Sequence, residues 1–125
     1  MIIKCKKIIS PTTKEDLGKS STWLTVGKEY VVLALQWDRK FGILAMIQAD
    51  CYNEPVFIPL EGFEIISQKI PGSWKGEIDE YGTFEVMPKS WLYDEFLQEL
   101  EDQTQNTMKL FEEESRIIYE EEGLI

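Results

Sequence analysis

The sequence of 125 residues contains no histidine and only two cysteines, and it has no apolar run near the roughly 20 residues that span a membrane. Without histidine, Ser-His-Asp and Cys-His catalysis and histidine-containing zinc sites are excluded, and two thiolates cannot complete a cysteine-only zinc site. The N-terminal residues lack the apolar stretch and cleavage site of a signal peptide. We therefore expect a cytoplasmic protein without a membrane segment.

The two cysteines, Cys5 and Cys51, show no CxxC spacing. A chain of this length with an ordinary hydrophobic fraction needs no disulfide for stability, and free cysteine is usually buried. We predict two separate, reduced and buried thiols.

Motifs that hold cofactors are also missing, because there is no GxGxxG, GxxxxGK[ST] or EF-hand spacing. Only carboxylate chemistry stays open, with Glu77 and Asp79 as the candidate acid and base. Neighbouring carboxylates are expected by chance where acidic residues are this dense, and a chain of this size leaves little room for a substrate groove. The sequence therefore predicts no catalytic residues, no cofactor and no metal.

Charge is distributed very unevenly along the chain. The formal net charge is -10, with +1 in residues 1–62 and -11 in residues 63–125. An acidic surface repels phosphate backbones and attracts basic surfaces, so we expect a basic protein partner and no direct contact with nucleic acid. The alternative is that the charge serves solubility only.

The first part of the chain has the pattern of β-strands separated by turns. A loop is predicted at residues 10–21, where proline, glycine and small polar residues gather. Val56, Ile58 and Leu60 are expected on one face of a strand, with Phe57 on the other. Strands are predicted at residues 1–9, as an edge or terminal strand, and at 23–26, 29–37, 43–49 and 56–60.

Two hairpins are indicated by turn residues. One turn spans residues 38–42, and the other spans residues 79–82 between strands at 74–78 and 83–86. Several short strands at about ten-residue spacing predict a small antiparallel sheet, curled as in SH3-like barrels.

Helical periodicity begins after Pro88. Ser90 is the predicted N-cap, residues 103–107 are polar enough to interrupt the helix, and Gly123 is the predicted stop. The predicted apolar stripe of the first helical segment consists of Leu92, Phe96, Leu97 and Leu100. We expect one α+β domain over residues 1–125, mainly β at 1–87 and mainly α at 88–122.

The acidic residues of the second half give the predicted partner-binding surface. Runs such as Glu112-Glu113-Glu114 place like charges within one turn, which costs helix stability without benefit to the fold. A solvated helix face is the alternative. The predicted site consists of Asp79, Glu80, Asp94, Glu95, Glu99, Glu101 and Asp102, with Glu95, Glu99 and Asp102 expected on the solvent face of the helix.

The four tryptophans could stack on bases, as in proteins that bind single strands. Such sites need basic residues nearby, and Trp74 and Trp91 lie in the acidic half. Core packing or protein contact is the preferred interpretation.

Short stretches of the sequence are similar to a known family. They are Leu24-Thr-Val-Gly-Lys-Glu-Tyr-Val-Val-Leu, Trp74-Lys-Gly-Glu-Ile-Asp-Glu-Tyr-Gly, Pro88-Lys-Ser-Trp-Leu and Phe111-Glu-Glu-Glu. In size and order of elements the chain resembles small bacterial immunity proteins that accompany polymorphic or contact-dependent growth-inhibition toxins.

The resemblance implies a cytoplasmic antidote that neutralises one toxin domain, often a nuclease, by stoichiometric binding. It supplies no catalytic residues. An acidic DNA mimic, or an adaptor or regulatory protein of phage origin, is the alternative function.

Overall fold

The computed structural model describes residues 1–10, 13, 15–16, 18, 23–51 and 55–124. Most of the predicted loop at 10–21 lies outside the described residues. The described strands are β1 (Ile2–Cys5), β2 (Glu29–Val31), β3 (Ala34–Asp38), β4 (Gly42–Gln48), β5 (Pro55–Pro59), β6 (Phe63–Ser67), β7 (Trp74–Ile78) and β8 (Phe84–Pro88). The helices are η1 (Lys89–Trp91, a 3₁₀-helix), α1 (Phe96–Glu101) and α2 (Gln105–Glu121).

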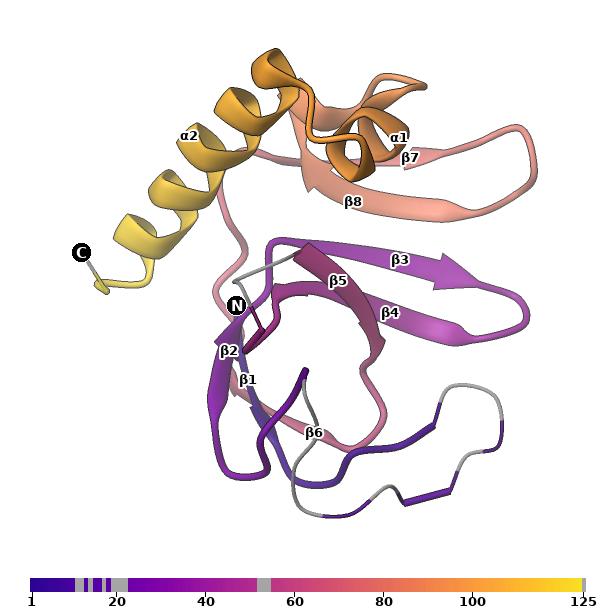
Figure 1. The fold of residues 1–125 in the computed structure, drawn as a ribbon, viewed down its shortest axis with the longest axis vertical. Coiled ribbons are helices and arrows are strands. Elements are labelled where there is room, and N and C mark those ends of the chain that lie inside the picture. Colours follow the sequence, from indigo (N-terminus) through magenta and orange to yellow (C-terminus); the bar gives the residue numbers. More distant parts are fainter. Residues whose placement is uncertain (11–12, 14, 17, 19–22, 52–54, 125) are drawn as a thin grey trace.

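The strands form two antiparallel sheets, and the helices follow them in the chain. The three-stranded sheet has the order β2-β1-β6, and the five-stranded sheet has the order β5-β4-β3-β8-β7. Figure 1 shows the helices beside β7 and β8, with the three-stranded sheet at the opposite end. The predicted α+β class is confirmed, whereas the SH3-like closure stays a prediction.

The first strand is shorter and more central than expected. β1 ends at Cys5 and pairs with both β2 and β6, so of the two predicted placements, edge or terminal strand, the edge placement is wrong. The pairing with β6 was not predicted, because an isolated run of alternating residues carries no signal for a partner far along the chain. Burial alternates along β1, with Ile3 and Cys5 fully buried.

The predicted long strand at residues 29–37 is split between the two sheets. β2 ends at Val31 and β3 begins at Ala34, and the two residues between them connect the sheets. Val32 N–H donates to Met1 C=O at 2.9 Å, and Leu33 N–H donates to Met46 C=O at 2.8 Å. A run of buried apolar residues looks the same whether a strand is straight or bends from one sheet to the next, which is why the sequence predicted one strand.

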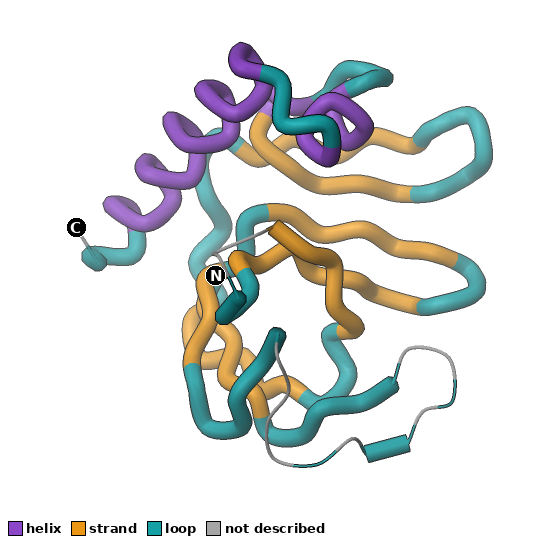
Figure 2. The backbone as a smooth tube through the Cα atoms, viewed as in Figure 1, coloured by secondary structure: helices purple, strands orange, loops and turns teal. Residues whose placement is uncertain are grey.

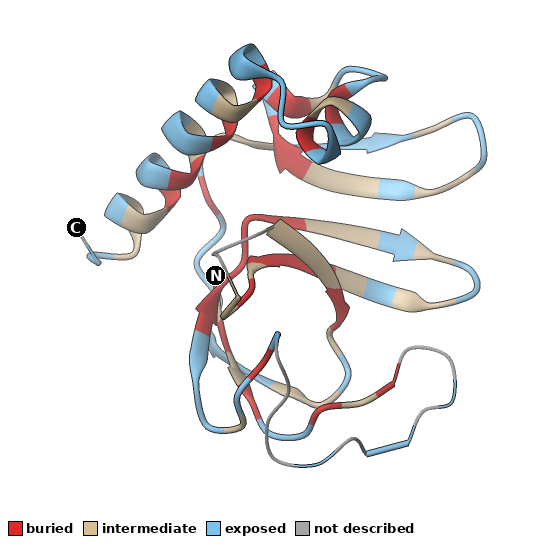
Figure 3. Ribbon diagram, viewed as in Figure 1, coloured by how far each residue is buried: buried red, intermediate tan, exposed pale blue. Residues whose placement is uncertain are grey.

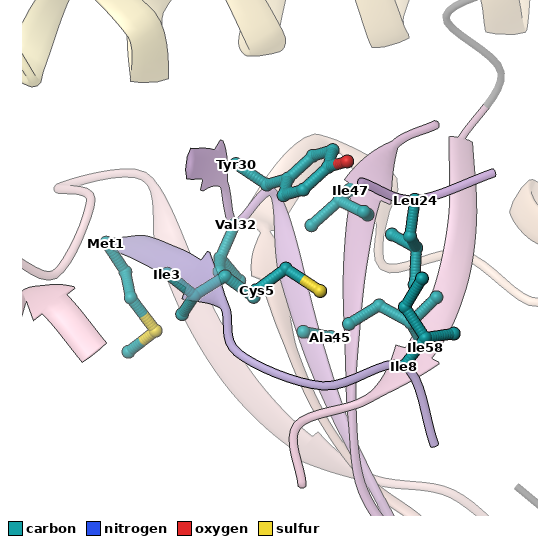
Figure 4. Packing of buried hydrophobic residues seen from close by; sticks show 10 residues of the cluster. All are labelled: Met1, Ile3, Cys5, Ile8, Leu24, Tyr30, Val32, Ala45, Ile47 and Ile58. Atoms are coloured by element: carbon teal, nitrogen blue, oxygen red, sulfur yellow. The ribbon is translucent and has the colours of Figure 1, made fainter. Parts of the chain in front are cut away.

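Two hydrophobic cores lie on opposite faces of the five-stranded sheet. The first is enclosed by both sheets, and Figure 4 shows its buried side chains, among them Ile3, Tyr30 and Ile47. The second lies under η1, α1 and α2. β5 divides its side chains between the cores as predicted: Val56 and Ile58 pack in the first core, and Phe57 packs in the second.

Both predicted hairpins are present, and Figure 2 shows their loops at the same end of the five-stranded sheet. In the first, Asp38 Oδ1 accepts hydrogen bonds from the N–H groups of Lys40 and Phe41, at 2.7 and 3.0 Å. In the second, Ile78 is paired with Phe84, so the predicted start of the returning strand at Thr83 is wrong by one residue.

The first α-helix begins later than predicted, at Phe96. Ser90 lies inside η1 and does not cap a helix, because its hydroxyl donates instead to Glu114 at 3.2 Å. The predicted interruption is confirmed, since α1 ends at Glu101 and Gln103 has a φ of 56°. The predicted stop is also confirmed: Gly123 has a φ of 76°, and its N–H donates to Glu120 C=O at 2.9 Å.

The cysteines are both free, so the prediction of two separate thiols is confirmed. Cys5 is buried as expected, and burial raises the pKa of its thiol. Cys51 is only half-buried, contrary to the expectation. In the described part of the chain, none of the helices has the length and apolar character needed to cross a membrane.

Candidate partner-binding groove

A groove of about 580 Å³ separates the β7–β8 hairpin from the segment that leads from η1 into α1. Figure 1 shows α1 in front of these two strands. We call this feature the acidic groove. Its lining residues are Gln36, Glu77, Ile78, Asp79, Glu80, Tyr81, Glu85, Met87, Trp91, Leu92, Tyr93, Asp94, Phe96 and Leu97.

The base of the groove is formed by tightly packed apolar side chains. Met87, Trp91 and Phe96 are each only 1% exposed. The Trp91 ring stacks on Phe96 with centroids 5.1 Å apart and on Phe111 with centroids 5.4 Å apart. Trp91 Nε1–H donates to Leu110 C=O at 3.3 Å, which satisfies the buried indole. Trp91 therefore fixes η1 between α1 and α2, and with it one wall of the groove.

The polar lining of the groove carries one sign of charge. Five of its residues are carboxylates, Glu77, Asp79, Glu80, Glu85 and Asp94, and none of the lining residues is lysine or arginine. Glu77 and Glu85 lie directly opposite each other on β7 and β8. Like charges in that position destabilise an antiparallel pair.

Glu85 is the carboxylate most affected by this arrangement. Burial raises its pKa, the nearby charges of Asp79 and Glu77 raise it further, and the hydrogen bond from Gln36 opposes them. Gln36 Nε2–H donates to Glu85 Oε1 at 2.9 Å. The folded state therefore holds a carboxylate whose ionised form is disfavoured.

The hairpin tip forms one rim of the groove. Asp79 Oδ1 accepts hydrogen bonds from the N–H groups of Tyr81 and Thr83, at 2.8 and 2.9 Å, and these bonds shape the turn. The turn leaves Tyr81 83% exposed and Ile78 68% exposed. A large aromatic side chain is thus presented to solvent beside the carboxylates.

The predicted site residues divide between the groove and other surfaces. The structure brings Asp79, Glu80 and Asp94 together in the acidic groove. Glu95 is exposed and directly precedes α1. The other three predicted residues, Glu99, Glu101 and Asp102, do not line the groove.

Glu101 and Asp102 lie at the far end of α1. Glu101 borders a separate pocket with Phe57 and Leu100. Asp102 accepts a hydrogen bond from Gln98 Nε2–H at 3.3 Å on the same helix.

Glu99 corrects the expectation of a purely solvent-facing carboxylate. Its Oε2 accepts hydrogen bonds from Tyr93 OH at 2.7 Å and from Thr107 Oγ1 at 2.9 Å. The two hydroxyl oxygens are themselves 3.0 Å apart. Thr107 is 1% exposed and belongs to α2. Glu99 is therefore a structural residue on α1 that connects Tyr93, three residues before this helix, to Thr107 on α2.

Among the groove residues that sequence reasoning missed are Glu85, Tyr81 and Tyr93. Glu77 was considered only as half of a candidate catalytic pair. The register of the hairpin could have placed Glu77 opposite Glu85, but only if the predicted turn had included Thr83. Tyr93 has no local signal, because α1 begins later than the apolar stripe suggests.

No group of three or more His, Cys, Asp or Glu side chains in the described ranges is arranged to hold a metal ion. No family model matches this chain, and neither a curated protein nor a solved structure matches it. What the groove offers chemically is a set of carboxylates beside exposed aromatic and apolar side chains.

Proposed function

We propose that this protein is a bacterial immunity protein that acts in the cytoplasm and neutralises a basic toxin domain by stoichiometric binding in the acidic groove. The observation that carries the proposal is the pairing of Glu77 with Glu85 on adjacent strands inside that groove. This pairing costs stability in the free protein. A cationic side chain from a partner would offset that cost.

The raised pKa of Glu85 supports the same interpretation. A lysine or arginine of the partner, placed between Glu77 and Glu85, would favour their ionised forms and would make charge-assisted hydrogen bonds. The gain is greatest where the pair is shielded from water, and Glu85 is already half-buried.

The rim of the groove provides apolar contact area for the same partner. Tyr81 is 83% exposed and Tyr93 is 36% exposed. Tyrosine is enriched among the interface residues whose truncation weakens binding most. The carboxylates would steer a basic partner towards the groove, and the tyrosines would slow its dissociation.

The test uses the toxin domain encoded by the neighbouring reading frame, with growth rescue and binding kinetics as readouts. The groove variant is E77Q/E85Q, and the matched control is E112Q/E113Q, which removes the same charge from exposed positions on α2. We expect the groove variant to weaken binding about tenfold or more and the control to change it less than about threefold. Equal effects of the two variants, or a parent protein that neither binds nor protects, would contradict the proposal.

Competition experiments on the same complex distinguish an immunity protein from a DNA mimic. If the captured partner is a DNA-binding protein and duplex DNA competes with this chain for it, the acidic groove occupies a nucleic-acid site. A toxin that is bound equally well with and without added DNA supports binding away from such a site.

A further inference from the structure

β7 forms one edge of the five-stranded sheet, and no strand of the described residues pairs with its outer side. Lys89 N–H donates to Ser73 C=O at 2.9 Å, and Asp79 N–H donates to Thr83 C=O at 3.0 Å. Because backbone groups alternate along an antiparallel strand, the N–H and C=O of Gly76 and Ile78 point away from β8. The outer edge therefore offers hydrogen-bonding groups to another strand.

This edge is open to solvent. Lys75, Gly76, Glu77 and Ile78 are all exposed, and Figure 3 shows the exposed part of β7. At Gly76 the Phe84 ring covers one face, with ring atoms 3.1 and 3.3 Å from the position of an added Cβ. The exposed surface of Gly76 therefore belongs to the other face and to the outer edge.

The sequence of β7 is complementary to itself in one register. Pairing two copies antiparallel about Gly76 sets Lys75 of each copy opposite Glu77 of the other. It also sets Trp74 of each copy opposite Ile78 of the other. Such reciprocal pairing is what a two-fold interface requires, and opposite charges in directly paired positions stabilise a sheet.

Neighbouring registers are disfavoured by the same charges. A two-fold axis at Lys75 would place two lysines opposite each other, and an axis at Glu77 would place two glutamates opposite each other. A lysine on an edge strand generally discourages unwanted pairing. Here Glu77 lies two positions after Lys75, so the lysine of each copy meets the glutamate of the other in the register centred on Gly76.

We propose that a second copy of this chain binds along β7, antiparallel and centred on Gly76, so that the two five-stranded sheets become one continuous sheet. The proposal does not depend on the function proposed for the acidic groove.

An exposed apolar row leads to this edge. Ile43, Trp37, Phe84 and Ile78 are paired in register across β4, β3, β8 and β7, and each is more than 40% exposed. Ile78, at 68%, is the most exposed of the four and the nearest to the open edge. In the proposed dimer Trp74 of the second copy lies opposite it, so the row continues onto the next chain instead of ending in water.

The experiment measures mass in solution by sedimentation over a dilution series, at about 0.15 M salt. At this salt concentration the Debye length is about 8 Å, so repulsion between the net charges of the two copies is screened more than attraction between the directly paired charges. We expect the parent to approach twice the 14.6 kDa of one chain with increasing concentration. K75E and E77K each place like charges opposite one another twice, so each should weaken self-association about tenfold or more. The swapped double variant K75E/E77K should restore it.

Mixing provides the decisive comparison. When K75E and E77K chains are combined, every paired position carries opposite charges, so a heterodimer should form that neither variant forms alone. Circular dichroism checks that each variant is folded. A parent that stays at the mass of one chain, folded single variants that dimerise as the parent does, or a mixture that stays monomeric would each overturn the proposal.

Discussion

Glu77 and Glu85 face each other across the β7–β8 hairpin as a directly paired residue couple of like charge. The cost of this arrangement falls mainly on Glu85, which is more buried than the exposed Glu77. Among the described residues, Gln36 on β3 supplies the one side-chain hydrogen bond to Glu85. The neutral amide of Gln36 does not cancel the repulsion between the two carboxylates. Removing one of the two charges by substitution should therefore stabilise the hairpin.

Replacing Glu85 with glutamine should stabilise the protein at neutral pH. The pKa of Glu85 is raised in the folded state by burial and by the charges of Asp79 and Glu77. A raised pKa contributes stability that is present below the pKa of the unfolded chain and is lost as the pH rises through the folded value. E85Q should therefore flatten the fall in unfolding free energy between mildly acidic and neutral pH, measured by urea denaturation. The control is E112Q, which removes a carboxylate from an exposed position on α2, and a profile that is the same in E85Q and E112Q would contradict the assignment.

Asp50 should show the opposite dependence on pH. Burial would raise its pKa, but hydrogen bonds from Lys28, Thr25 and Tyr30 outweigh burial and hold the pKa below its usual value. The donor distances are 2.5, 2.7 and 3.0 Å. The stability contributed by this depressed pKa is present above the unfolded pKa and is lost as the pH falls through the folded value.

D50N should lower the unfolding free energy at neutral pH by about 1–2 kcal/mol, because three donors lose a charged acceptor. The control is E64Q, which removes the carboxylate of the exposed Lys6–Glu64 ion pair and should cost less than about 0.5 kcal/mol. Equal losses in the two variants at neutral pH would mean that the Asp50 cluster contributes no more than a surface pair.

Tyr30 should titrate well above the ordinary range of tyrosine. Burial and the nearby Asp50 raise its pKa to about 12. The stability linked to this raised pKa is fully present below the unfolded value of 10.0 and is lost as the pH rises through about 12. An ultraviolet titration of tyrosinate should show a late component near pH 12, and Y30F should remove it. A titration in which Y30F leaves the late component in place would refute the assignment.

Charge reversal at carboxylates in and next to α1 should lower the unfolding free energy only where the carboxylate has a structural role. E99K removes the acceptor shared by Tyr93 and Thr107 and should destabilise the protein by about 2 kcal/mol, because a buried hydroxyl loses a charged partner. Asp102 is exposed and directly follows α1. The unfolding free energy of D102K should therefore stay within about 0.5 kcal/mol of the parent value. Thermal unfolding of the two variants tests this, and similar melting temperatures would show that the bonds to Glu99 contribute little.

Tyr81 should affect binding and not folding. Its side chain is 83% exposed, so Y81A should leave the unfolding free energy within about 0.5 kcal/mol of the parent. If the acidic groove holds the toxin domain, the same substitution should speed dissociation of the complex about tenfold or more. The control is W23A, which removes another exposed aromatic side chain away from the groove.

Local patterns predicted the parts of the fold that depend on neighbouring residues. The alternation at Val56, Phe57 and Ile58 correctly divided β5 between two cores, because successive side chains of a strand point to opposite faces. Gly42 and Gly123 marked a turn and a helix end correctly, since both adopt the positive φ that glycine tolerates.

The features that sequence reasoning missed depend on long-range contacts or on single-residue offsets. The role of Glu99 follows from its contact with Thr107 on α2, which periodicity on α1 cannot reveal. The pairing of Glu77 with Glu85 depends on Asp79 capturing the N–H of Thr83, which lengthens the turn by one residue. A shift of one residue moves every side chain of a strand to the other face, so the groove could not be located from composition.

The passage of the chain from β2 to β3 has a consequence for how the protein opens. Val32 N–H is bonded to Met1, Leu33 N–H is bonded to Met46, and Leu33 C=O accepts the indole N–H of Trp74 at 3.1 Å. Neither sheet can separate from its core without disturbing this one dipeptide. In hydrogen-exchange terms, the amides of Val32 and Leu33 should exchange only through global unfolding, so their protection reports the stability of the entire molecule.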